Sequence, residues 1–234
     1  MRVIDLTHTI TASMPVYPGT QPPVLAAANT YEKDGFKETL VTMFSHTGTH
    51  VDPPAHLFPG RTTLDAFPAG QFIGKALVID CRMLDEGQPI TMAQLTPYGE
   101  LVAQADVLLF NTGWDKRWGS DRYFGDYPCL DDEVMALILS GDYKGIGFDV
   151  IGLDPIADEN LTRHKRLFRE KDILNIENLA RHRSPPASAG SSRTKTGRCR
   201  TAPGWPGSRC SGCPSPGTAS CAGSGSRRRW GQGR

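Results

Sequence analysis

The sequence predicts one mixed α/β domain over residues 1–180, followed by a tail of different composition. Short apolar runs typical of buried strands recur through these residues, and segments with a helical spacing of apolar side chains lie between them. Clusters of proline and glycine separate the two kinds of segment. An alternation of strands and helices is typical of a mixed α/β fold. The 234 residues allow one large domain or two small ones.

In chain order, residues 3–8 are predicted to form the first strand, and proline and glycine within 14–19 predict a turn. Residues 39–45 are rich in β-branched and aromatic side chains, which favours a second strand. A loop with Pro/Gly turns is expected at 58–70. The apolar run 75–80 is then predicted to be a short, fully buried strand.

Helices are predicted at 91–102 and 130–139. Thr91 can cap the first helix with its hydroxyl, and Pro97 predicts a break or kink within it. The second helix has acidic residues in its first turn, apolar residues at helical spacing and Gly141 after its end. The remaining strands are predicted at 106–110, 145–150 and 172–177.

Three of the six histidines and one aspartate lie within residues 46–56. Gly48 and the pair Pro53–Pro54 disfavour a helix in this segment. If the strand predicted before the segment continues through it, every second side chain falls on one face. That face then carries His46, Gly48, His50 and Asp52.

Two neutral imidazoles and a carboxylate that converge on one point suit a Zn²⁺ or Mn²⁺ ion. A metal would also remove the cost of burying the carboxylate of Asp52 without a partner. Structural zinc sites usually contain cysteine, and no cysteine lies near this segment. The sequence therefore predicts a metal site at His46, His50 and Asp52 and disfavours a purely structural zinc.

Two further polar residues stand out, but their pattern alone assigns no function. His164 lies in a predicted loop, and Glu177 lies near the end of the last predicted strand. An acid on a mostly apolar strand usually points to solvent, so the pattern alone favours an exposed Glu177.

The net charge of +1 is the sum of two parts of the chain that carry large charges of opposite sign. Residues 1–180 contain all 25 acidic residues and 15 lysines and arginines, which gives −10, whereas residues 181–234 contain 11 lysines and arginines and no acid, which gives +11. The second part also contains no Leu, Ile, Val, Met, Phe or Tyr. Such a segment cannot bury enough apolar surface to offset chain entropy, so the tail is predicted to be disordered.

Two interpretations of residues 181–234 fit this composition. A basic arm could bind nucleic acid or another acidic surface. Alternatively, the tail is a frameshift product, because Arg, Gly, Ala, Pro, Ser, Cys and Trp are what a GC-rich gene yields when it is translated out of frame. The composition changes abruptly after a predicted strand at 173–179, which favours the frameshift.

The sequence also indicates where the protein acts. No apolar run is long enough to span a bilayer, so no membrane contact is expected. The N-terminus lacks the apolar core of a signal peptide. These features predict a cytoplasmic protein, in which nucleic acid would bind only through the basic tail.

The segment 46–56, His-x-Gly-Thr-His-x-Asp-x-Pro-x-His, resembles the signature of the metal-dependent cyclase family. That family includes bacterial kynurenine formamidases and the related isatin hydrolases. Other segments match family landmarks in family order, namely 5–8, 17–19, 111–114, 147–155, His164 and 176–179. The resemblance covers about residues 1–180 and implies a swivelling β/β/α fold with a mixed sheet, and usually homodimers or homotetramers.

The resemblance also implies a centre of two metals per chain, Zn²⁺ or Mn²⁺. His46, His50 and Asp52 would bind one metal. Asp52 would bridge to a second metal held by His164 and Glu177, with Glu177 reaching both. Isatin hydrolases carry glutamine where this chain has Glu177, so the glutamate favours the two-metal arrangement.

His56 would be the catalytic acid/base, and Tyr17 would line the substrate pocket, a position at which kynurenine formamidases tend to carry tryptophan. Family members continue after the segment 177–179 with further sheet structure, which residues 181–234 do not match. This departure agrees with the frameshift interpretation.

The predicted function is hydrolysis of a small amide or ester, such as N-formylkynurenine, by a metal-activated hydroxide with His56 as general acid/base. One alternative is an isatin-type hydrolase of a cyclic amide. The other is an inactive metal-binding protein that lacks its family's last strands.

Overall fold

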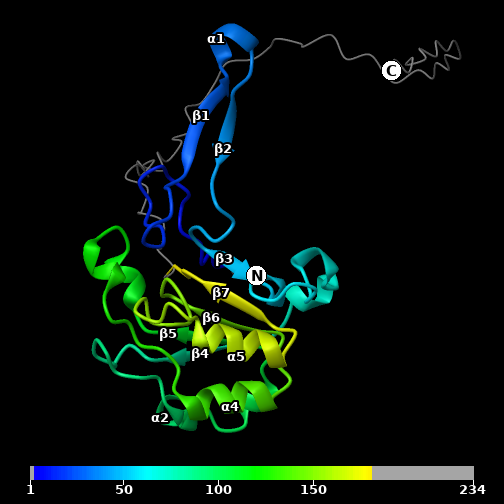
Figure 1. The fold of residues 1–234 in the computed structure, drawn as a ribbon, viewed down its shortest axis with the longest axis vertical. Helices are drawn as coiled ribbons and strands as arrows, with labels where there is room; N and C mark the ends of the chain where they lie inside the picture. Colours follow the sequence, from blue (N-terminus) through cyan, green and yellow to red (C-terminus); the bar gives the residue numbers. More distant parts are fainter. Residues whose placement is uncertain (1–2, 181–234) are drawn as a thin grey trace, which may run out of the picture. The chain divides into compact units, whose positions relative to one another are not determined.

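The computed structural model describes residues 3–180 (Figure 1). These residues belong to one compact unit. Predictions about the tail, both its disorder and its origin in a frameshift, lie outside the described residues. Within the described part of the chain, no helix is both long and apolar enough to cross a membrane.

A five-stranded mixed sheet forms the centre of the fold, as the sequence predicted. Its order is β3-β7-β6-β5-β4, with β4 to β7 parallel and β3 antiparallel to β7. The strands are β3 His50–Asp52, β4 Ala76–Asp80, β5 Val107–Asn111, β6 Gly145–Phe148 and β7 Leu174–Glu177.

A separate antiparallel hairpin precedes this sheet. It consists of β1 Val24–Asn29, the short helix α1 Tyr31–Asp34 and β2 Glu38–Thr42. Almost all of its residues are exposed. The sequence predicted only its second strand, because the three alanines of β1 carry little β-propensity.

The remaining elements are helical. The α-helices are α2 Met92–Leu95, α3 Leu101–Gln104, α4 Asp132–Ser140 and α5 Thr162–Glu170. The 3₁₀ helices are η1 Pro54–His56, η2 Leu64–Ala66, η3 Ala69–Phe72, η4 Thr96–Tyr98, η5 Trp114–Arg117 and η6 Asp121–Phe124. Figure 1 shows α4 and α5 together on one side of the five-stranded sheet.

The core lies between these two helices and the sheet. Alternate residues of β5 and β6 face it, and the rings of Phe110 and Phe148 stack with centroids 5.1 Å apart. Ile138 from α4 and Phe168 from α5 are fully buried in the same cluster. Burial of these large side chains therefore fixes the sheet that carries the functional groups.

Both segments predicted to be helical, 91–102 and 130–139, contain helices. Thr91 forms a capping box with Gln94 at the start of α2, and the helical segment breaks at Pro97 into separate short helices. Asp131 caps α4 by accepting from the backbone N–H of Val134 at 2.8 Å. Such local signals are enough to place a helix start or a helix break from the sequence, because a cap and a proline act through neighbouring backbone groups.

Two strand predictions need correction. Residues 3–10 form no strand, because isolated hydrogen bonds rather than a ladder hold them. The carbonyl of Leu6 accepts from the backbone N–H of Ala180, and the hydroxyl of Thr49 accepts from the backbone N–H of His8. Strand β4, expected to be fully buried, is an edge strand, so Ile79 is 0% exposed whereas Val78 is 50% exposed.

The predicted continuous strand through residues 46–52 is also wrong. Strand β2 ends at Thr42, and β3 begins at His50. Gly48, between them, has a φ of +66°, a left-handed conformation that interrupts an extended chain. His46 therefore reaches the site from a loop, although His50 and Asp52 share one face as predicted.

Candidate metal centre

The pairing of β3 with β7 places polar side chains from distant parts of the chain on one face. In this antiparallel register His50 lies opposite Glu177, and Asp52 lies opposite Asn175. Directly opposed residues, and residues two apart on one strand, project to the same side of a sheet. The four side chains therefore meet at one edge of the five-stranded sheet.

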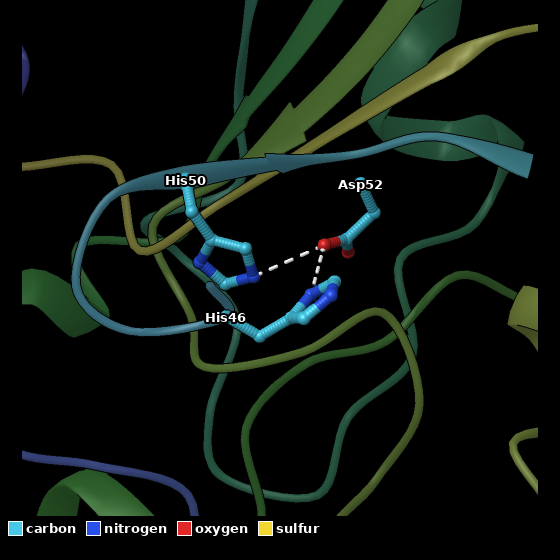
Figure 2. A group of neighbouring side chains, drawn as sticks. All are labelled: His46, His50 and Asp52. Carbon is cyan, nitrogen blue, oxygen red and sulfur yellow. Dashed lines mark ion pairs between the residues drawn. The ribbon is translucent and has the colours of Figure 1, made fainter. Parts of the chain in front are cut away.

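His46, His50 and Asp52 form the first ligand group (Figure 2). Asp52 Oδ1 lies 2.6 Å from His46 Nδ1 and 3.1 Å from His50 Nε2. Figure 2 shows both rings turned toward this carboxylate oxygen. The side chain of Asp52 is only 1% exposed. The three residues predicted to bind a metal are thus brought together.

The donor atoms of this group fit a metal better than they fit one another. His50 Nε2 and Asp52 Oδ1 are buried, yet neither has a hydrogen-bond partner among the described residues, because their close contact lacks hydrogen-bond geometry. His50 Nδ1–H donates to the Gly48 carbonyl at 2.8 Å, which turns Nε2 toward Asp52. A divalent cation would satisfy both orphaned atoms.

Asp52, His164 and Glu177 form the second ligand group. His164 Nε2 lies 3.0 Å from Glu177 Oε1 and 3.6 Å from Asp52 Oδ2. All three side chains are nearly buried. Asp52 thus belongs to both groups, with one oxygen facing each. Contrary to the expectation from its strand pattern alone, Glu177 is buried, because β3 covers the edge of β7.

His164 was predicted to lie in a loop, but it lies in the first turn of α5. Asp154 explains both the helix and the ring orientation, because its carboxylate accepts from the backbone N–H groups of Arg163 and His164 at 2.6 and 3.1 Å. It also accepts from His164 Nδ1–H at 2.6 Å, which leaves Nε2 facing the site. The only sign of this role in the sequence is that Asp154 falls within the family landmark at 147–155.

Buried charges shift the pKa values of the ligands. Burial by itself lowers the pKa of His50, but the adjoining carboxylates of Asp52 and Glu177 outweigh it and raise this pKa to about 9. Burial likewise opposes protonation of His164, but Asp154, Asp52 and Glu177 raise its pKa well above the usual value. Burial would raise the pKa of Asp52, but the three histidines hold it well below its usual range. Without a metal, the cluster therefore holds protons.

We predict that the affinity of the metal-free protein for Zn²⁺ rises between pH 7 and pH 9. Because the raised pKa of His50 keeps its ring protonated up to about pH 9, a metal must displace that proton. Each displaced proton should raise the apparent affinity about tenfold per pH unit. Competition with a chelator of known affinity at pH 7, 8 and 9 measures this slope, and a flat profile would contradict a metal bound by His50.

His56 lies beside the ligands but belongs to neither group among the described residues. It ends the 3₁₀ helix η1, and its ring centroid is 3.8 Å from that of His46 and 6.4 Å from that of His164. Burial, followed by electrostatic repulsion from the neighbouring His46, lowers the pKa of His56 to about 4. Its imidazole is therefore neutral at pH 7 and able to accept a proton.

A cleft of about 500 Å³ opens onto both ligand groups and His56. Tyr17, which the resemblance placed in the substrate pocket, lines it and is 37% exposed. Phe44, Ile151 and Leu161 add apolar surface to the same cleft. The combination of apolar lining with a few polar groups suits a small aromatic ligand.

The mixed sheet and the two ligand groups define the chain as an α/β protein with a candidate metal centre at one edge of its sheet. Residues 4–155 match the model of the family described as "Putative cyclase". The chain belongs to this cyclase family, as the motif at 46–56 indicated.

Individual relatives align with a longer part of the chain than the family model does. An uncharacterised protein of Methanocaldococcus jannaschii is 32% identical over 182 residues, 76% of this chain and 81% of the relative. The kynurenine formamidase of Salinibacter ruber is 27% identical over 189 residues, 80% of this chain and 86% of the relative. The structure of isatin hydrolase A from Labrenzia aggregata bound to benzyl benzoate matches with a TM-score of 0.67 and 24% identity, over 77% of this chain and 81% of the other. This last likeness supports the fold.

Proposed function

We propose that this protein is an arylformamidase-like enzyme that hydrolyses the amide of a small acylated aromatic amine such as N-formylkynurenine. Membership of the cyclase family, together with its kynurenine formamidase relatives, makes it a hydrolase of C–N bonds other than peptide bonds. The observation that carries the proposal is the convergence of two ligand groups on Asp52, beside a neutral His56, in the lining of a largely apolar cleft.

The proposed metal centre follows from the two ligand groups. His46, His50 and Asp52 would hold one divalent ion, and Asp52, with His164 and Glu177, would hold a second. We propose Zn²⁺ or Mn²⁺, because imidazole and carboxylate donors suit both. When bound, such ions lower the pKa of water and polarise a carbonyl oxygen.

The chain's own residues would then orient the substrate and move a proton. The aromatic part of the substrate would lie against Tyr17 and Phe44, which places its amide toward the ligand groups. His56 would accept a proton from the attacking water at a ring nitrogen and return it to the leaving amine. Proton transfer of this kind typically contributes about 10²–10⁴-fold to the rate.

Turnover assays on the full chain test the proposal. N-formylkynurenine should be hydrolysed in the presence of Zn²⁺ or Mn²⁺ and not after treatment with a chelator. Isatin, offered at the same concentration, tests the cyclic amide as the alternative substrate. A preference for isatin would overturn the formamidase assignment, and a metal-loaded chain that turns over neither compound would be a metal-binding protein without this activity.

A further inference from the structure

Asn175 lies at the centre of the second ligand group, although neither its place in the sequence nor the family motif points to it. It is 0% exposed and lies opposite Asp52 in the pairing of β3 with β7. On β7 it lies two residues before Glu177, and therefore on the same face. The fold thus adds an amide to the carboxylates and the imidazole already described.

The amide group touches every member of the second group. Asn175 Nδ2 donates to Glu177 Oε1 at 2.8 Å and to Asp52 Oδ2 at 3.1 Å. It also lies 3.2 Å from His164 Nε2. An NH₂ group has two hydrogens to donate, so three contacts exceed what it can satisfy. Meanwhile Asn175 Oδ1 is buried and has no hydrogen-bond partner within residues 3–180.

The spacing of these atoms matches a set of metal ligands. Four atoms are close to one another here: Asn175 Nδ2, Glu177 Oε1, Asp52 Oδ2 and His164 Nε2. Their contacts span 2.8 to 3.6 Å. Donors bound to one ion through bonds of about 2.0–2.2 Å lie about 2.8–3.6 Å apart when their bonds make right or tetrahedral angles. The terminal amide of Asn175 is therefore close enough to bind the metal directly, and its role need not be limited to hydrogen bonds with the other ligands.

We propose that Asn175 is a fourth protein ligand of the second metal and binds it through the amide oxygen Oδ1. Without a metal, the amide presents its nitrogen to two carboxylates, because N–H groups offset their charge. With a cation among the carboxylates, a half-turn of the amide presents Oδ1 instead, and the two orientations have nearly the same shape. The proposal rests on the proposed two-metal centre but not on the substrate.

This ligand makes the two metal positions chemically different. The first group offers two imidazole nitrogens and one carboxylate oxygen, whereas the second then offers three oxygens and one nitrogen. Carboxylate and carbonyl oxygens suit Mn²⁺, while imidazole suits Zn²⁺. The second position should accordingly accept Mn²⁺ readily.

Binding of Mn²⁺ to the full-length, metal-free chain tests the proposal without any turnover. Electron paramagnetic resonance of free Mn²⁺ during a titration gives the number of ions bound and their affinities. The unmodified chain should bind two. Asn175→Ala should bind the second ion at least about tenfold more weakly, as His164→Ala should, whereas Asn175→Asp, which keeps an oxygen at the position, should retain it. Asn111→Ala, which removes an amide from β5 of the same sheet, is the matched control and should bind both ions.

Other outcomes overturn the proposal. If Asn175→Ala binds the second ion as tightly as the unmodified chain, or more tightly, the amide only donates hydrogen bonds to the carboxylates. If the unmodified chain binds only one ion, the proposal is also contradicted. Circular dichroism of each variant, and an unchanged first binding step, show that the fold and the first ligand group persist. Because the measurement counts ions, a failure of the proposed substrate leaves its result intact.

Discussion

Asp52→Ala should lose both metal ions, whereas His164→Ala should lose mainly one. Asp52 is the residue shared by the two ligand groups, with Oδ1 beside His46 and His50 and Oδ2 facing His164. Removing it takes one donor from each position and leaves the first group with two imidazoles. Metal content per chain, measured by elemental analysis after dialysis, should fall from two ions toward zero.

Asp52→Asn is the matched variant for this experiment. The amide keeps the size of the side chain but removes the negative charge that offsets the charge of the metals, so it should also lose most of the metal. Circular dichroism shows whether either variant still folds. Full occupancy in a folded Asp52→Ala chain would contradict the bridging role of Asp52.

His56→Ala should keep both metals and lose about 10²–10⁴-fold in kcat on N-formylkynurenine. The ring of His56 lies against that of His46, but it belongs to neither ligand group among the described residues. Its lowered pKa, about 4, keeps the ring neutral at pH 7, and that form accepts a proton. Steady-state kinetics combined with metal analysis of the same sample separates proton transfer from metal binding.

His56→Gln serves as the control, because it keeps a polar side chain that does not titrate near neutral pH. It should be as impaired as the alanine variant if proton transfer is the role of His56. Added imidazole should restore part of the activity of His56→Ala, since the space left by the ring adjoins the cleft. Loss of metal from His56→Ala, with activity recovered on metal addition, would instead make His56 a ligand.

Much of the sheet and of the helices could be predicted, because their signals are local. Strands β5 and β6 are mostly apolar runs, β7 alternates apolar and polar residues, and α2 and α4 begin at side chains that cap them. The helix α5 could not be predicted in this way. Its N-cap position is Leu161, which forms no side-chain cap, and Asp154 supplies acceptors to the helix from another segment.

The sequence by itself determined the first ligand group and the family. His50 and Asp52 lie two apart on a strand, where the alternation of side chains brings them to one face whatever the rest of the chain does. The composition of residues 46–56 was likewise sufficient to indicate a metal, and the resemblance to the family assigned the nearby acid/base. Even there, the loop that carries His46 required the structure, because the left-handed Gly48 breaks the period of two.

The family resemblance named Asp52, His164 and Glu177 as a second group, but only the tertiary structure decided how they come together. Asp52 meets Asn175 across 123 positions of sequence, and it does so because β3 pairs with β7 in one register. A shift of one residue in that pairing would turn the facing side chains to the other side of the sheet. The periodicity of a short strand fixes which of its residues share a face, but it carries no information about which distant strand will lie beside it. For that reason the strand pattern alone favoured an exposed Glu177 and assigned no function to Asp154 or Asn175, whereas the packed sheet places all three around His164.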